Sequence, residues 1–261
     1  MKGHIIKVLK QIEIDYEVKV LYACESGSRA WGFPSEESDY DVRFIYVHKK
    51  EWYLSIDQKR DVLEIPVNDS LSIQVDPLLD LSGWELTKAL RLFRKSNPGL
   101  LEWLYSSNVY YQAFSTIEHM KSIESNVFAS PACYYHYLHM AKGNLKDLVR
   151  DEQLSIKKYL TTLRPILAAT WIVEKQTFPP IEFIKLVEEF ISEFKIKEEI
   201  LSILHYKKAG VMKVDFFPST LAYLQEQIVY LENASENLTV QDYDPTAELN
   251  QIFRDTLLEV W

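Results

Sequence analysis

Cysteine and glycine are scarce in this sequence, and no long apolar run is present. The 261 residues include only two cysteines, Cys24 and Cys133, and seven glycines. Two cysteines cannot build a disulfide framework, so we expect the protein to function in a reducing compartment. No apolar run approaches the roughly 20 residues that span a bilayer, and the first residues lack the apolar core of a secretory signal. These absences predict a cytoplasmic protein that makes no use of a membrane.

Composition and charge are those of a globular chain. Hydrophobic residues make up 47% of the sequence and charged residues 26%, which predicts a soluble protein with a substantial core, in one large domain or two smaller ones. The formal net charge of −9 argues against non-specific coating of nucleic acid, because such binding rests on neutralising phosphates. A local basic groove is compatible with this net charge, so the net charge does not indicate which substrate the protein binds.

Strand-like patterns occupy the first part of the chain. Apolar, β-prone runs at 18–24 and 42–47 predict two strands. Shorter alternating runs at 62–67 and 72–74 predict two more, joined by a hairpin turn at Asn68-Asp69. This half of the chain is therefore expected to form a small sheet.

Helical signals open the chain and dominate its second half. An amphipathic helix is expected to end near Asp15 or Tyr16. Ser82 and Glu85 form a capping-box pattern that predicts a helix to about Lys95, and Asn97-Pro98 predicts the start of another. Further helices are expected at 114–125, 132–150, 156–175, 181–194, 197–208, 219–231 and 246–260. The predicted fold class is α+β, with a sheet lobe over 1–112 followed by an all-α lobe over 113–261.

Two short motifs lie between the first two predicted strands: Gly27-Ser28, and Asp39-Tyr40-Asp41. Strand residues two apart share a face, so Asp39 and Asp41 point the same way. Two close carboxylates repel each other unless a cation neutralises them. A Gly-Ser turn offers N–H groups and a hydroxyl to phosphate oxygens. Together the motifs predict Mg²⁺- or Mn²⁺-dependent nucleotidyl transfer, with the aspartates on the metal and the turn on the NTP.

The same stretch, GSRAWG followed by SDYD, resembles the DNA polymerase β-like nucleotidyltransferase superfamily. The wider sequence, including GWELTKALRLFRKSNPGLLEWLYS and YYHYLHMAKGN, is similar to a branch of predicted, RlaP-type nucleotidyltransferases linked to RNA-repair gene clusters. The resemblance runs from about Val18 to about Pro180. It implies a catalytic lobe with a short mixed sheet, a helical lobe as the other wall of the cleft, and transfer of a nucleoside monophosphate from an NTP to a hydroxyl, with release of pyrophosphate.

Members of this superfamily use a third carboxylate from a neighbouring strand. The sequence offers Glu64, Asp76 and Asp80. Asp80 is favoured, because it has apolar neighbours on both sides and lies immediately before the predicted capped helix. Glu64 is the second choice, whereas Asp76 precedes a proline and is better suited to shaping a turn.

Four basic residues are candidates for nucleotide binding. Arg29 follows the Gly-Ser turn and has the geometry to bind a phosphate through two nitrogens; a surface salt bridge explains it equally well. Lys88 begins a row of cations at i, i+3 and i+7 on its predicted helix, a pattern that a solvated face also produces. The resemblance adds Lys158 and Arg164 from the helical lobe, for which pairing between helices is the alternative.

Two functions from different classes fit these patterns. The first is an enzyme that transfers a nucleoside monophosphate to a hydroxyl on RNA, a small molecule or a protein. The second is a nucleotide-sensing or partner-binding module that keeps the fold without turnover. The two clustered acids favour the enzyme, because binding alone does not require them. Neither the base nor the acceptor follows from the sequence, and RNA is suggested by the family association alone.

Overall fold

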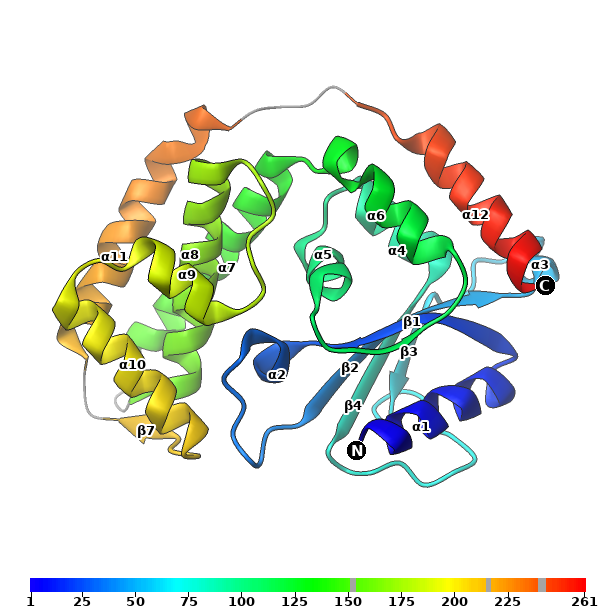
Figure 1. The fold of residues 1–261 in the computed structure, drawn as a ribbon, viewed down its shortest axis with the longest axis horizontal. Coiled ribbons are helices and arrows are strands. Elements are labelled where there is room, and N and C mark those ends of the chain that lie inside the picture. The colour runs from blue at the N-terminus through cyan, green and yellow to red at the C-terminus, as the bar shows by residue number, and fades with distance from the viewer. Residues whose placement is uncertain (151–153, 215–216, 239–242) are drawn as a thin grey trace. The chain divides into compact units, whose positions relative to one another are not determined.

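The computed structural model describes residues 1–150, 154–214, 217–238 and 243–261 (Figure 1). The chain forms two compact units. The first contains Met1–Ala30, Asp39–Phe128 and Asp242–Trp261, and the second contains Trp31–Ser38 and Ala129–Gln241. The boundary between the units differs from the change to an all-α lobe expected at residue 112, because α6 (Thr116–Val127) and α12 (Thr246–Val260) belong to the first unit. The limits of the functional domains, 1–112 and 113–261, stay a prediction.

The first unit is built on a five-stranded mixed sheet, which confirms the α+β fold class. Its strands are β1 (Val18–Glu25), β2 (Tyr40–His48), β3 (Val62–Ile65), β4 (Leu79–Glu85) and β5 (Val109–Gln112), in the spatial order β3-β4-β2-β1-β5. β2 and β4 are parallel, and the other neighbours are antiparallel. β1 and β2 are the strands that the apolar runs predict, whereas β5 has no counterpart in the prediction.

Alternation along β2 separates the core from the polar face of the sheet. Val42, Phe44 and Tyr46 are buried in one cluster with α1 (Lys2–Asp15). Because strand side chains alternate, Asp41 points to the opposite face. On the helix-rich side, α4 (Leu86–Arg94) contacts β2 and β4, and α6 contacts β1. The shorter helices of this unit are α3 (Lys50–Tyr53) and α5 (Pro98–Tyr105), and α2 (Gly27–Trp31) begins in it.

The predicted capping box at Ser82 is wrong. Ser82 and Gly83 lie inside β4, and the helix begins at Leu86, with Glu85 as its N-cap. The sheet requires the glycine, because a Cβ at Gly83 would lie 2.2 Å from the ring of Phe44 on the neighbouring strand. Close strand packing therefore overrides the local capping signal. The second predicted start is confirmed: Asn97 caps α5 by accepting a hydrogen bond from the N–H of Leu100.

The predicted hairpin at Asn68-Asp69 is also wrong. β3 pairs with β4 rather than with residues 72–74, which are in no strand. The N–H groups of Asn68 and Asp69 donate to the carbonyl of Glu64, and the carboxylate of Asp69 accepts from the N–H of Glu64 at 2.7 Å. The segment therefore turns back onto the end of β3 instead of forming a hairpin.

The second unit is helical, as the sequence predicts. Its helices are α7 (Ser130–Arg150), α8 (Ile156–Lys175), α9 (Phe183–Phe190), α10 (Phe194–Lys208) and α11 (Pro218–Asn233), followed by the 3-10 turn η1 (Ala234–Asn237). A two-stranded pairing of β6 (Leu154–Ser155) with β7 (Lys213–Val214) completes it. α8 is buried along most of its length and contacts α7, α9, α10 and α11. No helix in the described ranges is long and apolar enough to cross a membrane.

Candidate active site

Asp41 and Asp80 lie opposite each other on neighbouring strands. β2 and β4 run parallel, and Asp41 pairs in register with Asp80 near the point where both strands begin. In-register neighbours point to the same face of a sheet, and the residues that flank Asp80, Leu79 and Leu81, are buried against α1. The two carboxylates therefore project together from the opposite face. The structure brings together two of the three residues predicted to bind a metal.

Arg43 joins these two carboxylates, and the motif analysis misses it. Its Nη2 lies 3.0 Å from Oδ1 of Asp41 and 2.8 Å from Oδ2 of Asp80. Its Nη1 donates to the carbonyl of Asp80 at 3.1 Å. A signal was present in the sequence, because Asp39, Asp41 and Arg43 continue one polar row with a period of two into an otherwise apolar strand.

Gly27 lies directly against the Asp41 side chain. It opens α2 with a φ of +61°, a conformation that glycine adopts at little cost. A Cβ on Gly27 would lie 2.1 Å from Oδ2 of Asp41. The next residue back, Ser26, donates its N–H to the Asp41 carbonyl at 2.8 Å. The turn that contains Gly27 and Ser28 and the first acid of β2 are therefore packed together.

Asp39 and Arg29 meet at the entry to β2. Asp39 is exposed and directly precedes the strand, and its carbonyl accepts a hydrogen bond from Nε of Arg29 at 3.0 Å. The Arg29 guanidinium lies 3.8 Å from the ring centroid of Tyr40. Stacking and hydrogen bonding hold the arginine beside the Asp39 backbone. The structure thus places Arg29 next to the predicted metal-binding motif.

Glu25 is a buried acid that positions Asp41 through a hydrogen bond to its backbone. Its side chain is 1% exposed, and Oε1 accepts from the N–H of Asp41 at 2.8 Å. Oε2 accepts from the hydroxyl of Tyr110 on β5. Burial raises the pKa of Glu25 above its ordinary value and also raises the pKa of Tyr110. Sequence reasoning misses both residues; the available signal is an acid that closes an apolar strand.

The alternative third carboxylate, Glu64, has other partners. It pairs in register with Ser82, and Oε2 accepts from Arg60 at 3.1 Å and from Asn68 at 2.6 Å. Its strand, β3, neighbours β4 and not β2. Register therefore places Asp80, rather than Glu64, opposite Asp41.

The remaining predicted residues lie elsewhere. Lys88 is on α4, which begins where β4 ends, and its Nζ bonds Asp61 at 3.0 Å; the structure does not bring it to the end of the sheet that carries Asp41. Lys158 and Arg164 are on α8 of the second unit. Lys158 donates to the carbonyl of Asp147 at 3.4 Å. Arg164 is 3% exposed and lies 4.5 Å from the ring centroid of Trp31. Nucleotide binding by these three residues stays a prediction.

Comparison with known proteins decides the family. The model of the family described as RlaP, RNA repair pathway DNA polymerase beta family, matches residues 1–255. The chain belongs to this family. The resemblance carried by the Gly-Ser and Asp-x-Asp motifs is thereby confirmed.

Two proteins to which this RlaP-family chain is similar differ widely in their likeness to it. The uncharacterized protein YcgL of Bacillus subtilis (strain 168) is 47% identical over 266 residues, which cover 100% of this chain and 98% of YcgL. The crystal structure of a nucleotidyltransferase-like protein from Exiguobacterium sibiricum 255-15 matches with a TM-score of 0.33 and 10% identity, over 97% of this chain and 79% of that one.

The donor set suits the divalent cations that polymerase β-like nucleotidyltransferases use. Carboxylate oxygens are the ligands preferred by Mg²⁺ and Mn²⁺, and Asp41 and Asp80 present them on one face, with Asp39 just before the strand. Within the described ranges no three His, Cys, Asp or Glu side chains are grouped closely enough to form a metal site. The Arg43 guanidinium, rather than a third acid, lies between Asp41 and Asp80.

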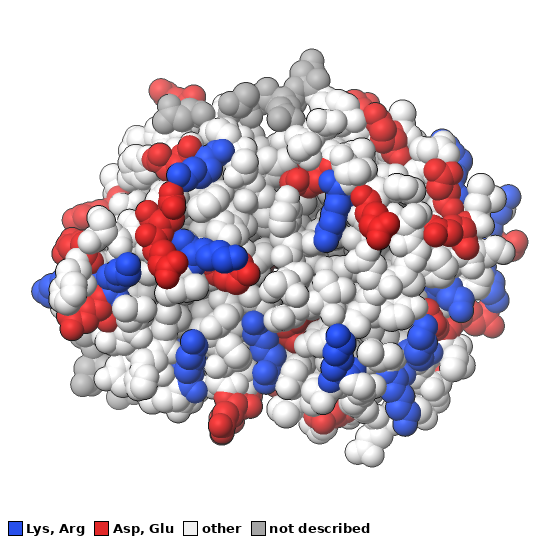
Figure 2. Space-filling model, viewed as in Figure 1, with Lys and Arg blue, Asp and Glu red and all other residues white. Residues whose placement is uncertain are grey.

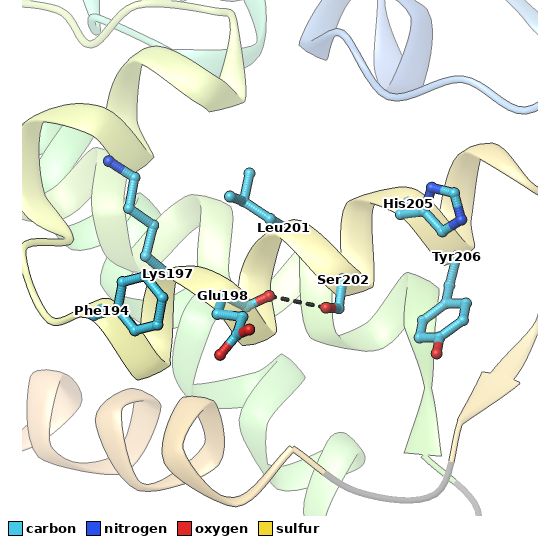
Figure 3. A pocket seen from close by; sticks show the side chains of 7 residues that line it. All are labelled: Phe194, Lys197, Glu198, Leu201, Ser202, His205 and Tyr206. Atoms are coloured by element: carbon cyan, nitrogen blue, oxygen red, sulfur yellow. Dashed lines mark hydrogen bonds between the residues drawn. The ribbon is translucent and has the colours of Figure 1, made fainter.

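A cavity of about 400 Å³ lies outside this site, along α10 of the second unit, and is lined by seven residues from Phe194 to Tyr206 (Figure 3). Within it, Ser202 Oγ donates to the carbonyl of Glu198 at 2.9 Å. None of the predicted site residues lines it. On the face shown in Figure 2, acidic and basic side chains are interspersed.

Proposed function

We propose that this RlaP-family chain is a metal-dependent nucleotidyltransferase, which moves a nucleoside monophosphate from an NTP to a hydroxyl acceptor and releases pyrophosphate. One observation carries the proposal: Asp41 and Asp80 face each other in register on parallel strands, with Gly27 packed against the Asp41 carboxylate. Clustered acids beside a Gly-Ser turn are costly for a binding module and useful for phosphoryl chemistry.

The residues divide into two groups. Asp39, Asp41 and Asp80 would hold Mg²⁺ or Mn²⁺, which when bound would neutralise phosphate charge and favour loss of the acceptor proton. Gly27 and Ser28 hold the β- and γ-phosphates of the NTP, because the glycine lets the phosphate approach the backbone closely.

The reaction that this arrangement serves is an in-line displacement. The acceptor oxygen bonds to the α-phosphorus as its proton leaves, and the bond from that phosphorus to the pyrophosphate oxygen breaks. The protein contributes mainly position and charge. Arg29 is the basic residue nearest the motif and would bind a phosphate oxygen, with Lys88, Lys158 and Arg164 as further candidates.

RNA is the proposed acceptor, and the cytoplasm the proposed location. The description of the family as part of an RNA repair pathway supports the first, and the scarcity of cysteine supports the second. Small molecules and proteins with free hydroxyls are the competing acceptors.

Turnover with single nucleotides tests the proposal. Purified protein is incubated with one α-labelled NTP at a time, with Mg²⁺ or Mn²⁺, and with an RNA oligonucleotide that ends in a free hydroxyl. We expect pyrophosphate release and labelled RNA from the wild type and neither from Asp41→Asn. Binding of NTP without pyrophosphate release from any acceptor class would instead establish the nucleotide-sensing module. Label on a small molecule or protein and not on RNA would keep the enzyme and replace the acceptor.

A further inference from the structure

The Asp41–Arg43–Asp80 bridge is a compact charge arrangement on the face of the sheet opposite α1, where its three side chains are 19–47% exposed. One nitrogen, Nη2 of Arg43, contacts carboxylate oxygens on two different strands, at 3.0 and 2.8 Å. The guanidinium carries one positive charge against two negative ones, so a negative charge remains. The exposed Asp39, two residues before Asp41, adds to it.

Nη2 of Arg43 contacts carboxylate oxygens that would hold a metal at this site. A cation held by these same two oxygens would compete with Arg43 for them. Two positive groups within a few ångströms repel each other, so a cation bound through these oxygens would weaken the hold of the carboxylates on the guanidinium. Arg43 and the cation therefore compete.

A second anchor keeps Arg43 at the site. Its Nη1 donates to the carbonyl oxygens of Asp80 at 3.1 Å and of Val42 at 3.3 Å. These bonds do not involve the carboxylates. The guanidinium can therefore release Asp41 while remaining beside the strands, and the arginine need not leave the sheet when a cation arrives.

We propose that Arg43 is a positioning residue that competes with a divalent cation: in the metal-free protein it holds Asp41 and Asp80 together, and it must give up their carboxylates before the cation binds. The inference rests on the proposed function, because it assumes that these acids bind the metal. It predicts that the metal alone binds weakly and that Arg43 is the cause.

Mn²⁺ binding without nucleotide tests the proposal directly. Free Mn²⁺ is titrated by electron paramagnetic resonance against the full-length wild type, Arg43→Gln, Arg43→Lys and Asp41→Asn. Arg60→Gln is the matched control, because Arg60 also bridges two acids, Glu64 at 3.1 Å and Asp69 at 2.8 Å, in the same unit. Circular dichroism establishes that each variant is folded.

We expect Arg43→Gln to bind Mn²⁺ at least about tenfold more tightly than the wild type, since one charge-assisted contact pair is removed. Arg43→Lys, which keeps the charge, and Arg60→Gln should stay close to the wild type, and Mn²⁺ should raise the melting temperature of Arg43→Gln the most. Should Arg43→Gln not fold, the charge-neutral Arg43→Met takes its place: Mn²⁺ binding tighter than in Arg60→Gln supports competition, and equal or weaker binding overturns it.

Failure of the inference and failure of the proposed function give different results. Wild-type Mn²⁺ binding that Asp41→Asn abolishes and Arg43→Gln leaves unchanged or weakens would overturn the role of Arg43 alone. Mn²⁺ binding that is the same in the wild type and Asp41→Asn, or absent in every protein, would overturn both the inference and the metal site on which the proposed function depends.

Discussion

Glu25 on β1 and Glu85 on β4 are two buried acids that lie beside opposite ends of β2. Glu25 pairs in register with Val42 near the start of that strand, and Glu85 pairs with Tyr46 near its end. They are 1% and 0% exposed, and burial raises the pKa of each. Each also accepts a hydrogen bond from a tyrosine hydroxyl and another from a backbone N–H.

The partners of the two glutamates separate their roles. Glu85 accepts from the N–H of Thr87 at 2.7 Å and from Tyr53 at 2.6 Å, so it caps α4 and fastens α3. Glu25 accepts from the N–H of Asp41, so it fixes an acid of the candidate site. Two buried Glu–Tyr pairs of the same kind thus have different roles: one stabilises the fold at one end of β2, and the other positions an acid of the candidate site at the other end. Burial and a raised pKa alone do not mark a functional residue.

The largest effect on turnover should come from Asp41, the acid whose N–H donates to Glu25 at the start of β2. We expect Asp41→Asn to lower turnover by at least about 10³-fold, with a nearly unchanged melting temperature, because Asp80 still pairs with Arg43. Pyrophosphate release and thermal melting measure the two effects. Asp39→Asn should behave in the same way. Full activity in either variant would reject the metal role of that residue.

Two glycines give the second comparison, since a Cβ meets a neighbour at each. Gly27→Val should push Asp41 and weaken NTP binding more than Ser28→Ala, which removes one hydrogen bond and should cost roughly ten- to a hundredfold in affinity. Gly83→Ala should instead press on Phe44 and lower stability by about 1–3 kcal/mol, with NTP affinity kept. Calorimetric titration of NTP with Mg²⁺, together with urea unfolding, separates these outcomes. Wild-type affinity in Gly27→Val would reduce the turn to a strand connector.

Removing each buried glutamate compares the two ends directly. Glu25→Ala and Glu85→Ala should each lower the free energy of unfolding by about 1–3 kcal/mol, because each leaves buried donors without an acceptor. Only Glu25→Ala should also lower turnover, by roughly ten- to a hundredfold, through misplacement of Asp41. Kinetics at a temperature where both variants are folded provide the measurement. Equal loss of turnover in the two variants would contradict the division of roles.

A pH effect, the smallest of the four, is expected at the Glu85 end. Burial lowers the pKa of His48 to about 4, from an ordinary value of about 6.5. The folded state therefore disfavours the proton, and the stability that depends on neutral His48 is present above pH 6.5 and is lost as pH falls toward 4. After discounting for partial exposure, the loss is at most about 1–2 kcal/mol.

The comparison of the wild type with His48→Phe isolates this effect. The flat ring can keep the stack on Trp52, whose centroid lies 4.2 Å away, but it does not titrate. The raised pKa values of Glu25 and Glu85 act in the opposite direction and are common to both proteins. Melting temperatures at pH 7 and pH 4.5 should fall less in His48→Phe, and parallel falls would contradict the assignment.

Local patterns predicted the elements better than the contacts between them. The period-two row predicted that Asp39 and Asp41 share a face, and the apolar runs predicted β1 and β2. The pairing of Asp41 with Asp80 depends on a parallel register between distant segments, which no local signal encodes. The favoured choice of Asp80 came from its neighbours and from the resemblance, and the helix start used to support it proved to be part of β4.

The missed residues share a physical reason. Arg43, Glu25 and Tyr110 act through partners on other strands, so their roles exist only after the sheet has formed. The capping box at Ser82 failed for a related reason, because its local preference lost to strand pairing and to the approach of Phe44 on Gly83.

The C-terminal helix α12 belongs to the sheet unit, although it is made last. The buried hydroxyls of Thr116 on α6 and Thr256 on α12 share a hydrogen bond of 2.8 Å, and Glu259 accepts from the N–H of Ser115 at 3.0 Å. A ribosome that adds about 5–20 residues per second delivers α12 several seconds after α6. During that interval the sheet unit lacks its last helix while residues 129–241 of the second unit are made, so a nascent chain can complete the helical unit before it completes the unit that carries Asp41 and Asp80.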